Sequence, residues 1–305
     1  MKKFVLYLII VLAGTIGIDL LFSFAVEKII SKGTVFSLFG GKKLASDITI
    51  FGASRAIRHY NPKIFADSMQ CNIQVLGCPK KSILFHYTMF KSMLDRTSVK
   101  PKLVILELAE IDINSRNNSE ELNVLYPFFY TETSVKEVLT DVLSSKELFM
   151  IKNSGIYRNN SNLIPYIKSL ITSKTSSVVV GFTPLNNIWN KPIEENVEVG
   201  KVDSIKIKYF EKMIDLCEEE EIKLVFVMSP CYRLLLVENW KEVVNEIANK
   251  HNIPVIDYEQ DSTFLAHQEW FYDSYHLNET GASIYSNIIV KELKTVLDNR
   301  LINID

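Results

Sequence analysis

The sequence lacks an excess of charge of either sign. Its 305 residues include 34 Lys and Arg against 36 Asp and Glu, for a formal net charge of -2. DNA-binding domains usually carry a clear basic excess, so we expect no nucleic-acid partner. The hydrophobic fraction of 47% and charged fraction of 23% are ordinary for a globular protein and argue against disorder.

Cysteine is scarce and follows no metal-binding pattern. The four cysteines are Cys71, Cys78, Cys217 and Cys231, with no CxxC pair and no zinc-like spacing. In an exported protein Cys71 and Cys78 could form a disulfide. Both flank a predicted buried strand, however, and packed thiols fit that position equally well.

Charge is also scarce in residues 4–26, which predict a membrane anchor over residues 1–30. Lys2 and Lys3 precede an apolar stretch from Phe4 to Val26 that only small residues and Asp19 interrupt. At about 1.5 Å per residue, roughly 23 residues span a hydrocarbon core of about 30 Å. A cleavable signal peptide would have a shorter apolar core and a better cleavage site. A buried core helix would need a large partner surface.

The charges around this stretch predict its orientation. The two amino-terminal lysines favour an amino end in the cytoplasm and the rest of the chain outside, although Lys28 and Lys32 lie just beyond the span. Asp19 is costly if it faces lipid. It either pairs with another helix or lies at the outer interface.

Beyond the anchor, residues 31–305 alternate between strand and helix patterns. Short apolar runs bounded by turn residues are typical of buried parallel strands, and intervening segments have helical periodicity. The pattern predicts an α/β fold with about five parallel strands and helices on both faces. We expect strands at 47–51, 73–76, 103–106, 224–228 and 253–257, helices at 82–94, 202–220, 237–248 and 282–296, and an N-cap at Asn278.

A long segment after the third strand breaks this alternation. Residues 110–200 are too many for a simple crossover and are rich in Asn, Ser and aromatic residues. We interpret them as an insertion with helices near 135–143 and 163–171. It would be a lid or substrate platform beside the catalytic edge, or equally a structural elaboration that never touches substrate.

Two polar motifs fall at the carboxyl edge of the predicted sheet. Ser54 lies in Gly52-Ala53-Ser54-Arg55, directly after the first strand, and Asp273 and His276 lie just before the final helix. A serine hydroxyl needs a base, usually an imidazole, and the imidazole needs a carboxylate to fix its tautomer. Each motif alone is weak, because a serine or aspartate at a helix start is common. Together they predict a catalytic triad.

These motifs resemble the SGNH (GDSL-like) hydrolase superfamily over residues 47–108 and 222–298. The resemblance implies a flavodoxin-like three-layer sandwich in which Ser54 is the nucleophile, His276 the general base and Asp273 its orienting acid. It also implies an oxyanion hole formed by the amides of Ser54 and Gly77, without metal or cofactor. A nucleotide-binding flavodoxin-like domain is excluded because no Gly-rich phosphate loop follows the first strand.

One family motif is absent. The superfamily usually supplies an Asn after the third strand as a further oxyanion donor, but Ile111 stands at that position. Loss of such a donor typically lowers the rate about 10²–10³-fold, unless Asn114 or another residue replaces it. Membrane-anchored proteins of bacterial envelope polymer O-acylation show a similar departure, and the start Gly-x-Ser-Arg and end His-Leu-Asn-x-x-Gly resemble that branch.

The resemblance therefore implies a serine esterase or O-acyltransferase, with O-acetyl the expected group, acting on an envelope polysaccharide. It would be a single-pass protein of a bacterial-type cytoplasmic membrane with its catalytic domain outside, and a membrane acyl-donor protein is an expected partner. Arg55 and Tyr232 are further candidates for substrate contacts, although Arg55 could instead form a salt bridge. The alternative function is a non-catalytic SGNH-fold scaffold, which the missing Asn makes credible.

Overall fold

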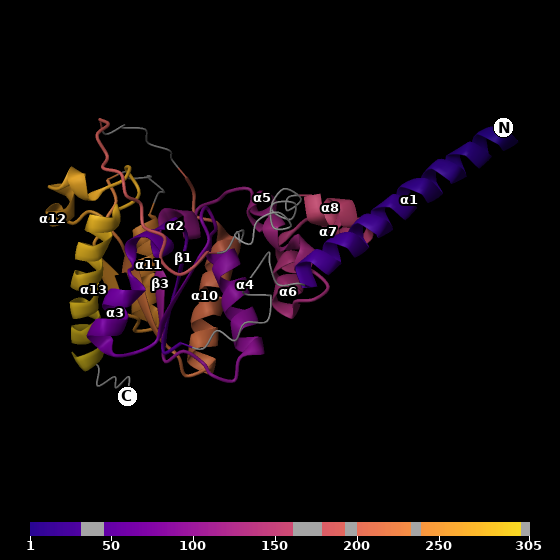
Figure 1. Ribbon diagram of the computed structural model, residues 1–305. Helices are drawn as coiled ribbons and strands as arrows, with labels where there is room; N and C mark the ends of the chain where they lie inside the picture. The colour runs from indigo at the N-terminus through magenta and orange to yellow at the C-terminus, as the bar shows by residue number, and fades with distance from the viewer. Residues whose placement is uncertain (32–45, 161–178, 193–199, 233–238, 300–305) are drawn as a thin grey trace. The chain divides into compact units, whose positions relative to one another are not determined.

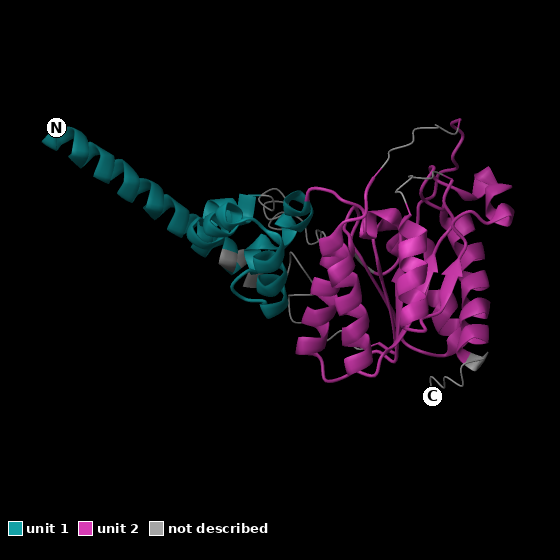
Figure 2. Ribbon diagram, turned by 180° about the vertical axis from the view of Figure 1, so that it is seen from behind, with its two compact units in different colours: residues 1–42, 118–177 teal, residues 43–117, 178–305 magenta. Residues whose placement is uncertain are grey.

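The computed structural model describes residues 1–31, 46–160, 179–192, 200–232 and 239–299. The chain divides into two compact units (Figure 2). Unit 1 combines Met1–Lys42 with Asn118–Ser177, and unit 2 combines Lys43–Asn117 with Val178–Asp305. Each unit therefore contains segments that are far apart in the sequence.

Unit 2 is built on a six-stranded sheet with the order β4-β2-β1-β3-β5-β6. Five of these strands are parallel, as the sequence predicted, and β4 pairs with β2 in the antiparallel direction. The two-residue edge strand β4 was not predicted. The strands are β1 Ile48–Gly52, β2 Ile73–Gly77, β3 Leu103–Glu107, β4 Val179–Val180, β5 Lys223–Met228 and β6 Val255–Asp257.

Helices cover both faces of this sheet, which explains why every residue of β1 and β3 is buried. On one face α4 packs against α10, and on the other α13 packs against α2 and α3 (Figure 1). The helices are α2 Ser54–His59, α3 Pro62–Met69, α4 Ile83–Arg96, α10 Ser204–Glu219, α11 Trp240–Lys250, α12 Ser262–Leu265 and α13 Glu279–Asn299, with 3-10 turns η1 Glu110–Asp112 and η4 Gln268–Trp270. The α/β class and its layers are thus confirmed.

The predicted helix boundaries agree with the structure to within a few residues. The N-cap at Asn278 is confirmed, because its side-chain oxygen accepts a hydrogen bond from Gly281 N at 3.0 Å. Residues 237–238 of the third predicted helix lie outside the described residues. All four cysteines are thiols rather than disulfides.

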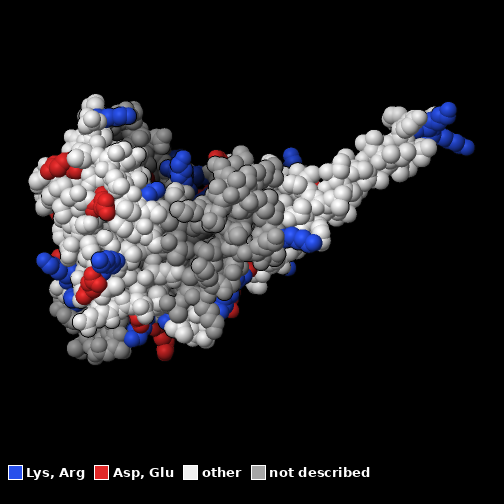
Figure 3. All heavy atoms as spheres, viewed as in Figure 1, with Lys and Arg blue, Asp and Glu red and all other residues white. Residues whose placement is uncertain are grey.

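Unit 1 contains the long amino-terminal helix and the helices of the 118–160 segment. Helix α1 includes an apolar window, Lys2–Val26, with a mean hydropathy of 2.4, which is long and apolar enough to cross a membrane. In Figure 3 most of α1 carries no charged side chains, and blue ones gather at its amino end, where Lys2 and Lys3 stand. The elements are α1 Lys2–Ser31, α5 Asn118–Leu122, η2 Asn123–Phe128, α6 Thr133–Val142, α7 Ser145–Asn153 and α8 Gly155–Asn159.

Helix α6 matches the helix predicted near 135–143. The helix predicted near 163–171 lies outside the described residues. Within unit 1, α8 packs against α1, and α7 packs against α8 (Figure 1).

Candidate active site

Ser54 is presented at the carboxyl edge of the sheet. It is the first residue of α2 and is separated from the end of β1 by Ala53 alone. The amide groups in the first turn of a helix have no intrahelical partners. The Ser54 amide and the Ser54 hydroxyl therefore both lie at the carboxyl edge of the sheet. The Ser54 Oγ lies 2.8 Å from the Nε2 of His276.

His276 is held in place by Asp273 through a tight turn before α13. The Nδ1 of His276 lies 2.9 and 3.0 Å from the two carboxylate oxygens. Asp273 Oδ1 also accepts hydrogen bonds from Tyr275 N at 2.8 Å and His276 N at 2.9 Å. The structure therefore brings the three predicted triad residues into one hydrogen-bonded chain, although Ser54 is more than two hundred residues from the other two in the sequence.

The hydrogen bonds to Asp273 keep it ionised. Partial burial acts to raise the pKa of this carboxyl, but the His276 ring and the two backbone amides outweigh burial and lower the pKa below its usual value. A carboxylate facing Nδ1 favours the tautomer in which Nδ1 carries the proton. The Nε2 lone pair of His276 is then free to accept the proton of Ser54.

A second histidine supports the loop that carries His276. His59 Nε2 accepts a hydrogen bond from Leu277 N at 2.9 Å, and its Nδ1 lies 2.7 Å from Ser229 Oγ. Ser229 Oγ in turn donates to Glu107 Oε1 at 2.6 Å. Burial, together with the nearby charges of His276 and the arginines on α2, lowers the pKa of His59 well below its usual value. This neutral imidazole therefore carries its proton on Nδ1.

Arg55 follows the nucleophile but is a buried structural residue. Its side chain is 6% exposed. Its Nε lies 3.2 Å from Glu107 Oε1, and its Nη1 lies 3.6 Å from Glu259 Oε1. Its terminal nitrogens donate to Leu108 O at 2.7 Å and Ser229 O at 3.2 Å. Of the two interpretations of Arg55, the structure favours the salt bridge over a substrate contact.

The same burial affects both partners of this ion pair. Burial acts to lower the pKa of Arg55, but the neighbouring Glu107 and Glu259 outweigh it and raise the pKa. For Glu107, burial dominates over Arg55 and raises the pKa to about 7. Glu107 is therefore a buried carboxyl whose protonation is sensitive to pH near neutrality.

Gly77 lies next to α2, but its amide points away from Ser54. Cys78 N donates to Gly52 O at 3.2 Å, so the Cys78 amide faces β1. Successive amides of a strand face opposite sides, and the Gly77 amide therefore faces β4. A Cβ at Gly77 would lie 2.5 Å from Ile57 Cγ2 and 2.9 Å from Ala53 O. This geometry corrects the expected oxyanion role: the glycine allows close packing of α2 on the sheet.

Ile111, which stands at the position of the absent Asn, lies beside the nucleophile. It is buried against Ala53 and Ala109, and η1 is closed by Asp112 Oδ2, which accepts from Ala109 N at 2.8 Å. Asn114 does not replace the donor. Asn114 is buried and forms an isolated β-bridge with Val202. Its side-chain oxygen lies so close to Gly200 that a Cβ added to that glycine would be only 2.3 Å away.

A pocket of about 230 Å³ opens at this triad. Sequence analysis did not single out several of its residues, among them Lys80, Arg116 and Tyr275. The backbone of Lys80 is in the left-handed region, with φ of +62°. This conformation is uncommon for a residue other than glycine, and residues that adopt it cluster at functional sites. The place of Lys80 after β2, at the same edge as Ser54, was the available signal. The lining residues are Ala53, Ser54, Arg55, Lys80, Ala109, Glu110, Ile111, Arg116, Tyr275 and His276.

Tyr232 lies beside the loop that carries Asp273, because its backbone N donates to Ser274 O at 3.0 Å. It packs against Trp189 and Phe271, with ring centroids 5.2 and 4.6 Å apart, and its hydroxyl donates to Leu265 O. It is not among the residues that line the pocket. Its ring therefore packs between these aromatic side chains, and its substrate contact stays a prediction.

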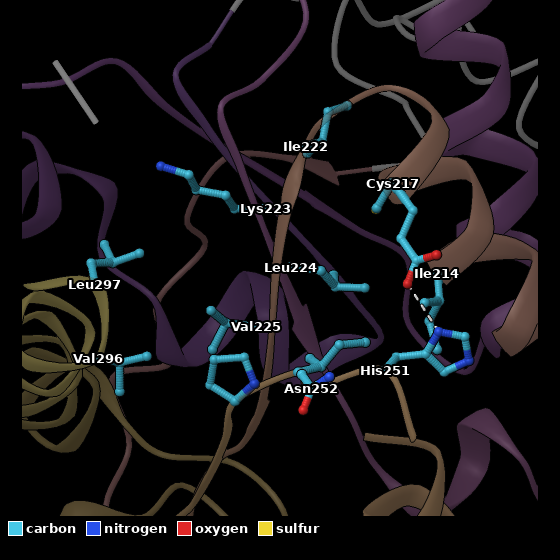
Figure 4. A pocket seen from close by; sticks show the side chains of 13 residues that line it. Ile214, Cys217, Ile222, Lys223, Leu224, Val225, His251, Asn252, Val296 and Leu297 are labelled. Atoms are coloured by element: carbon cyan, nitrogen blue, oxygen red, sulfur yellow. Dashed lines mark hydrogen bonds and ion pairs between the residues drawn. The ribbon is translucent and has the colours of Figure 1, made fainter. Parts of the chain in front are cut away.

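A second pocket, of about 190 Å³, lies where β5 and β6 begin. Figure 4 shows its mainly aliphatic lining and the ion pair of His251 with Glu218, in which Nδ1 and Oε1 are 2.9 Å apart. Ligands of parallel sheets bind at the carboxyl ends of the strands, and this pocket lies at the opposite edge. The pocket at Ser54 is accordingly the candidate active site.

Comparison with known proteins gives a distant structural likeness. No family model matches the chain, and no curated protein matches it in sequence. The chain is similar to a crystal structure of a “putative acylhydrolase” from Bacteroides fragilis, with a TM-score of 0.39 and 11% identity. The match covers 82% of this chain and 87% of that one.

Proposed function

We propose that the chain is an SGNH-type serine acyl hydrolase or O-acyltransferase. The observation that carries this proposal is the hydrogen-bonded chain from Ser54 Oγ through His276 to Asp273, with steps of 2.8 Å and 2.9 Å. Nucleophile, base and orienting acid within hydrogen-bond reach are the signature of covalent acyl transfer. The resemblance of the sequence motifs to the SGNH superfamily supports the same chemistry.

In the proposed reaction His276 Nε2 takes the Ser54 proton as Oγ forms a bond to the acyl carbonyl carbon. The tetrahedral intermediate collapses when its bond to the leaving alcohol breaks, and His276 returns the proton to that oxygen. The resulting acyl-serine is resolved by water in an esterase, or by a sugar hydroxyl in a transferase. Asp273 stays ionised and stabilises the imidazolium at each step.

The oxyanion requires donors other than those expected from the sequence. The Ser54 amide, at the start of α2, supplies one. We assign further stabilisation to the cationic side chains of Lys80 and Arg116, which line the same pocket, because positive charge near a developing oxyanion lowers the barrier.

The proposed substrate is an O-acylated glycan of the cell envelope. The pocket volume of about 230 Å³ is below the roughly 300–1,000 Å³ typical of pockets for drug-sized ligands, which favours a short group such as O-acetyl. The apolar helix α1 supports a single-pass membrane protein with the catalytic unit outside a bacterial-type cytoplasmic membrane. A membrane acyl-donor protein is the proposed partner in the transferase case.

A second candidate is a non-catalytic scaffold with the same fold. Ile111 in place of a donor and the orientation of the Gly77 amide favour it, because both weaken the oxyanion hole. The ordered triad favours catalysis, because a scaffold has no need for an imidazole aligned between a serine and a carboxylate.

The two candidates differ in reactivity towards a fluorophosphonate probe. The full chain in detergent would be compared with Ser54→Ala, His276→Ala and Ser283→Ala. Ser283 is a half-buried serine of α13 outside the pocket, and its hydroxyl donates to the Glu279 carbonyl. Acetate release from p-nitrophenyl acetate would be followed in parallel. Catalysis predicts labelling and turnover in wild type and Ser283→Ala alone. Absence of both from folded wild type would favour the scaffold.

A further inference from the structure

The only acidic residue within the apolar window of α1 has hydrogen-bonding partners on another helix. Asp19 Oδ1 accepts from Ser154 Oγ at 2.8 Å and from Ile156 N at 2.9 Å, and Oδ2 accepts from Gly155 N at 2.6 Å. All four residues belong to unit 1. The carboxylate of α1 therefore binds the first turn of α8 through three hydrogen bonds.

The backbones of α1 and α8 lie so close at Gly155 that a side chain would not fit between them. A Cβ at Gly155 would lie 1.5 Å from Ser23 Oγ and 3.3 Å from Asp19 O. The glycine thus lets the α8 backbone lie directly on the surface of α1. Together with the hydrogen bonds to Asp19, this close approach fixes the position of α8 along the axis of α1.

The position of Asp19 along α1 fixes the depth of α8 relative to a bilayer. Asp19 is fifteen residues beyond Phe4, where the apolar stretch begins, and at about 1.5 Å per residue these correspond to about 22 Å. A hydrocarbon core is about 30 Å thick. If α1 spans it from Phe4, the start of α8 lies within about 10 Å of the far boundary. That is the depth reached by helices that lie in the membrane interface.

The exposed side chains of α7 and α8 suit that environment. Phe149 on α7 is 63% exposed, and Ile156 on α8 is 43% exposed. Lys146 and Lys152, three residues to either side of Phe149, are also exposed. A helix face that combines an apolar side chain with flanking lysines is typical of interfacial helices, which bind both acyl chains and anionic headgroups.

We propose that α7 and α8 dock on the outer surface of the lipid bilayer, with Phe149 and Ile156 buried among the acyl chains and Lys146 and Lys152 at the lipid phosphates. The proposal rests on the membrane anchor of the proposed function. A bilayer is favoured over a protein partner because Ile156 N donates a hydrogen bond to Asp19 of α1, the helix that would span the membrane. The anchor alone therefore places this face against lipid.

The test is the depth of spin labels on the full chain in nanodiscs of phosphatidylcholine and phosphatidylglycerol, with no other membrane protein present. Nitroxides would be attached to Phe149→Cys and Ile156→Cys, and in separate samples to Leu12→Cys in the middle of α1 and to Val99→Cys, which is 55% exposed in unit 2. Collisions with oxygen report lipid, and collisions with a water-soluble nickel chelate report water. Identically treated unsubstituted protein gives the background from the four native cysteines.

We expect Phe149→Cys and Ile156→Cys to give a severalfold higher oxygen-to-nickel ratio than Val99→Cys, approaching that of Leu12→Cys. If both labels give the ratio of Val99→Cys while Leu12→Cys reports lipid, the docking proposal is overturned and the anchor stands. If Leu12→Cys itself reports water, the anchor fails, and the docking proposal fails with it.

Discussion

Replacement of Asp273 by Asn tests the proposed mechanism with little change in shape. One carboxylate oxygen of Asp273 accepts bonds from the amides of Tyr275 and His276, and both oxygens lie within 3.0 Å of His276 Nδ1. An Asn can keep the turn through a carbonyl oxygen at the position of Oδ1, 2.9 Å from Nδ1, but its NH₂ group then takes the position of Oδ2, 3.0 Å from the same nitrogen. To avoid two opposed donors, the imidazole moves its proton to Nε2.

The consequence is loss of the base without loss of the loop. With a proton on Nε2, His276 donates to Ser54 Oγ instead of accepting its proton. Replacement of the triad Asp by Asn in a serine protease lowers the rate about 10⁴-fold through this change of tautomer, and we expect a fall of about 10³–10⁴-fold here. That corresponds to about 4–5.5 kcal/mol of transition-state stabilisation. The assay is acetate release, with the fluorophosphonate labelling rate as a second readout.

Asp261→Asn is the matched control. Asp261 Oδ1 accepts from Thr263 N at 3.0 Å and Phe264 N at 3.3 Å, so it makes the same kind of turn at α12 without a histidine. Asn and Asp are similarly good at such positions, and we expect activity to be unchanged. If Asp273→Asn keeps its activity within about threefold, or if both variants lose activity equally, Asp273 does not act through the tautomer of His276.

Three other substitutions test the surroundings of the triad. His59→Ala leaves the buried Leu277 amide and Ser229 hydroxyl without this partner, at a cost of about 1–3 kcal/mol each; we expect lower melting temperature and slower labelling, and unchanged values would contradict the supporting role. Glu107 has a pKa raised from 4.5 to about 7, so its contribution to stability is complete below pH 4.5 and is lost as pH rises through 7. Glu107→Gln should flatten this fall in melting temperature between pH 5 and 8, and an equally steep fall would refute it. Ile111→Asn restores a donor and should raise acetate release about 10-fold or more, whereas no gain would place the oxyanion away from residue 111.

Tryptophan fluorescence suits the thermal measurements. All three tryptophans of the chain, Trp189, Trp240 and Trp270, lie in unit 2. A melting curve of the full-length protein in detergent therefore reports on the unit that carries the triad, while α1 contributes no tryptophan signal. The variants can be compared without removing the anchor.

The sheet was predictable because the local sequence of each central strand shows the pattern of a buried strand. Every residue of Ile48–Gly52 is buried and only Thr49 carries a polar group, since both faces of a central parallel strand are covered. The edge strand Val179–Val180 was not predictable, because two residues carry no periodicity and their strand character depends on pairing with Leu76 and Gly77. The short helix α3 was likewise not predicted, since too few residues define a helical stripe.

The positions of the triad residues followed from topology, but the surroundings did not. Residues after the first strand and before the last helix must meet at one edge of a parallel sheet, which placed Ser54 beside His276. Arg55 differs, because its role is set by Glu107 and Glu259, which come from other strand ends and bury it. The role of Gly77 depends on the direction of one amide, which a sequence motif does not encode.

Asp19 shows how a residue that is unfavourable in its own segment can be explained by another. Judged within α1, a carboxylate in an apolar window costs about 2.5–3.5 kcal/mol near the centre of a bilayer. In the structure it accepts three hydrogen bonds from residues 154–156, and two of these come from backbone amides that the first turn of α8 leaves unpaired. Each segment thus satisfies polar groups of the other. This mutual dependence explains why residues 118–160, which interrupt the α/β pattern, form a compact unit with α1. It also implies that removing residues 1–30 would expose the partners of Asp19 and Ser23, so functional assays should retain the anchor.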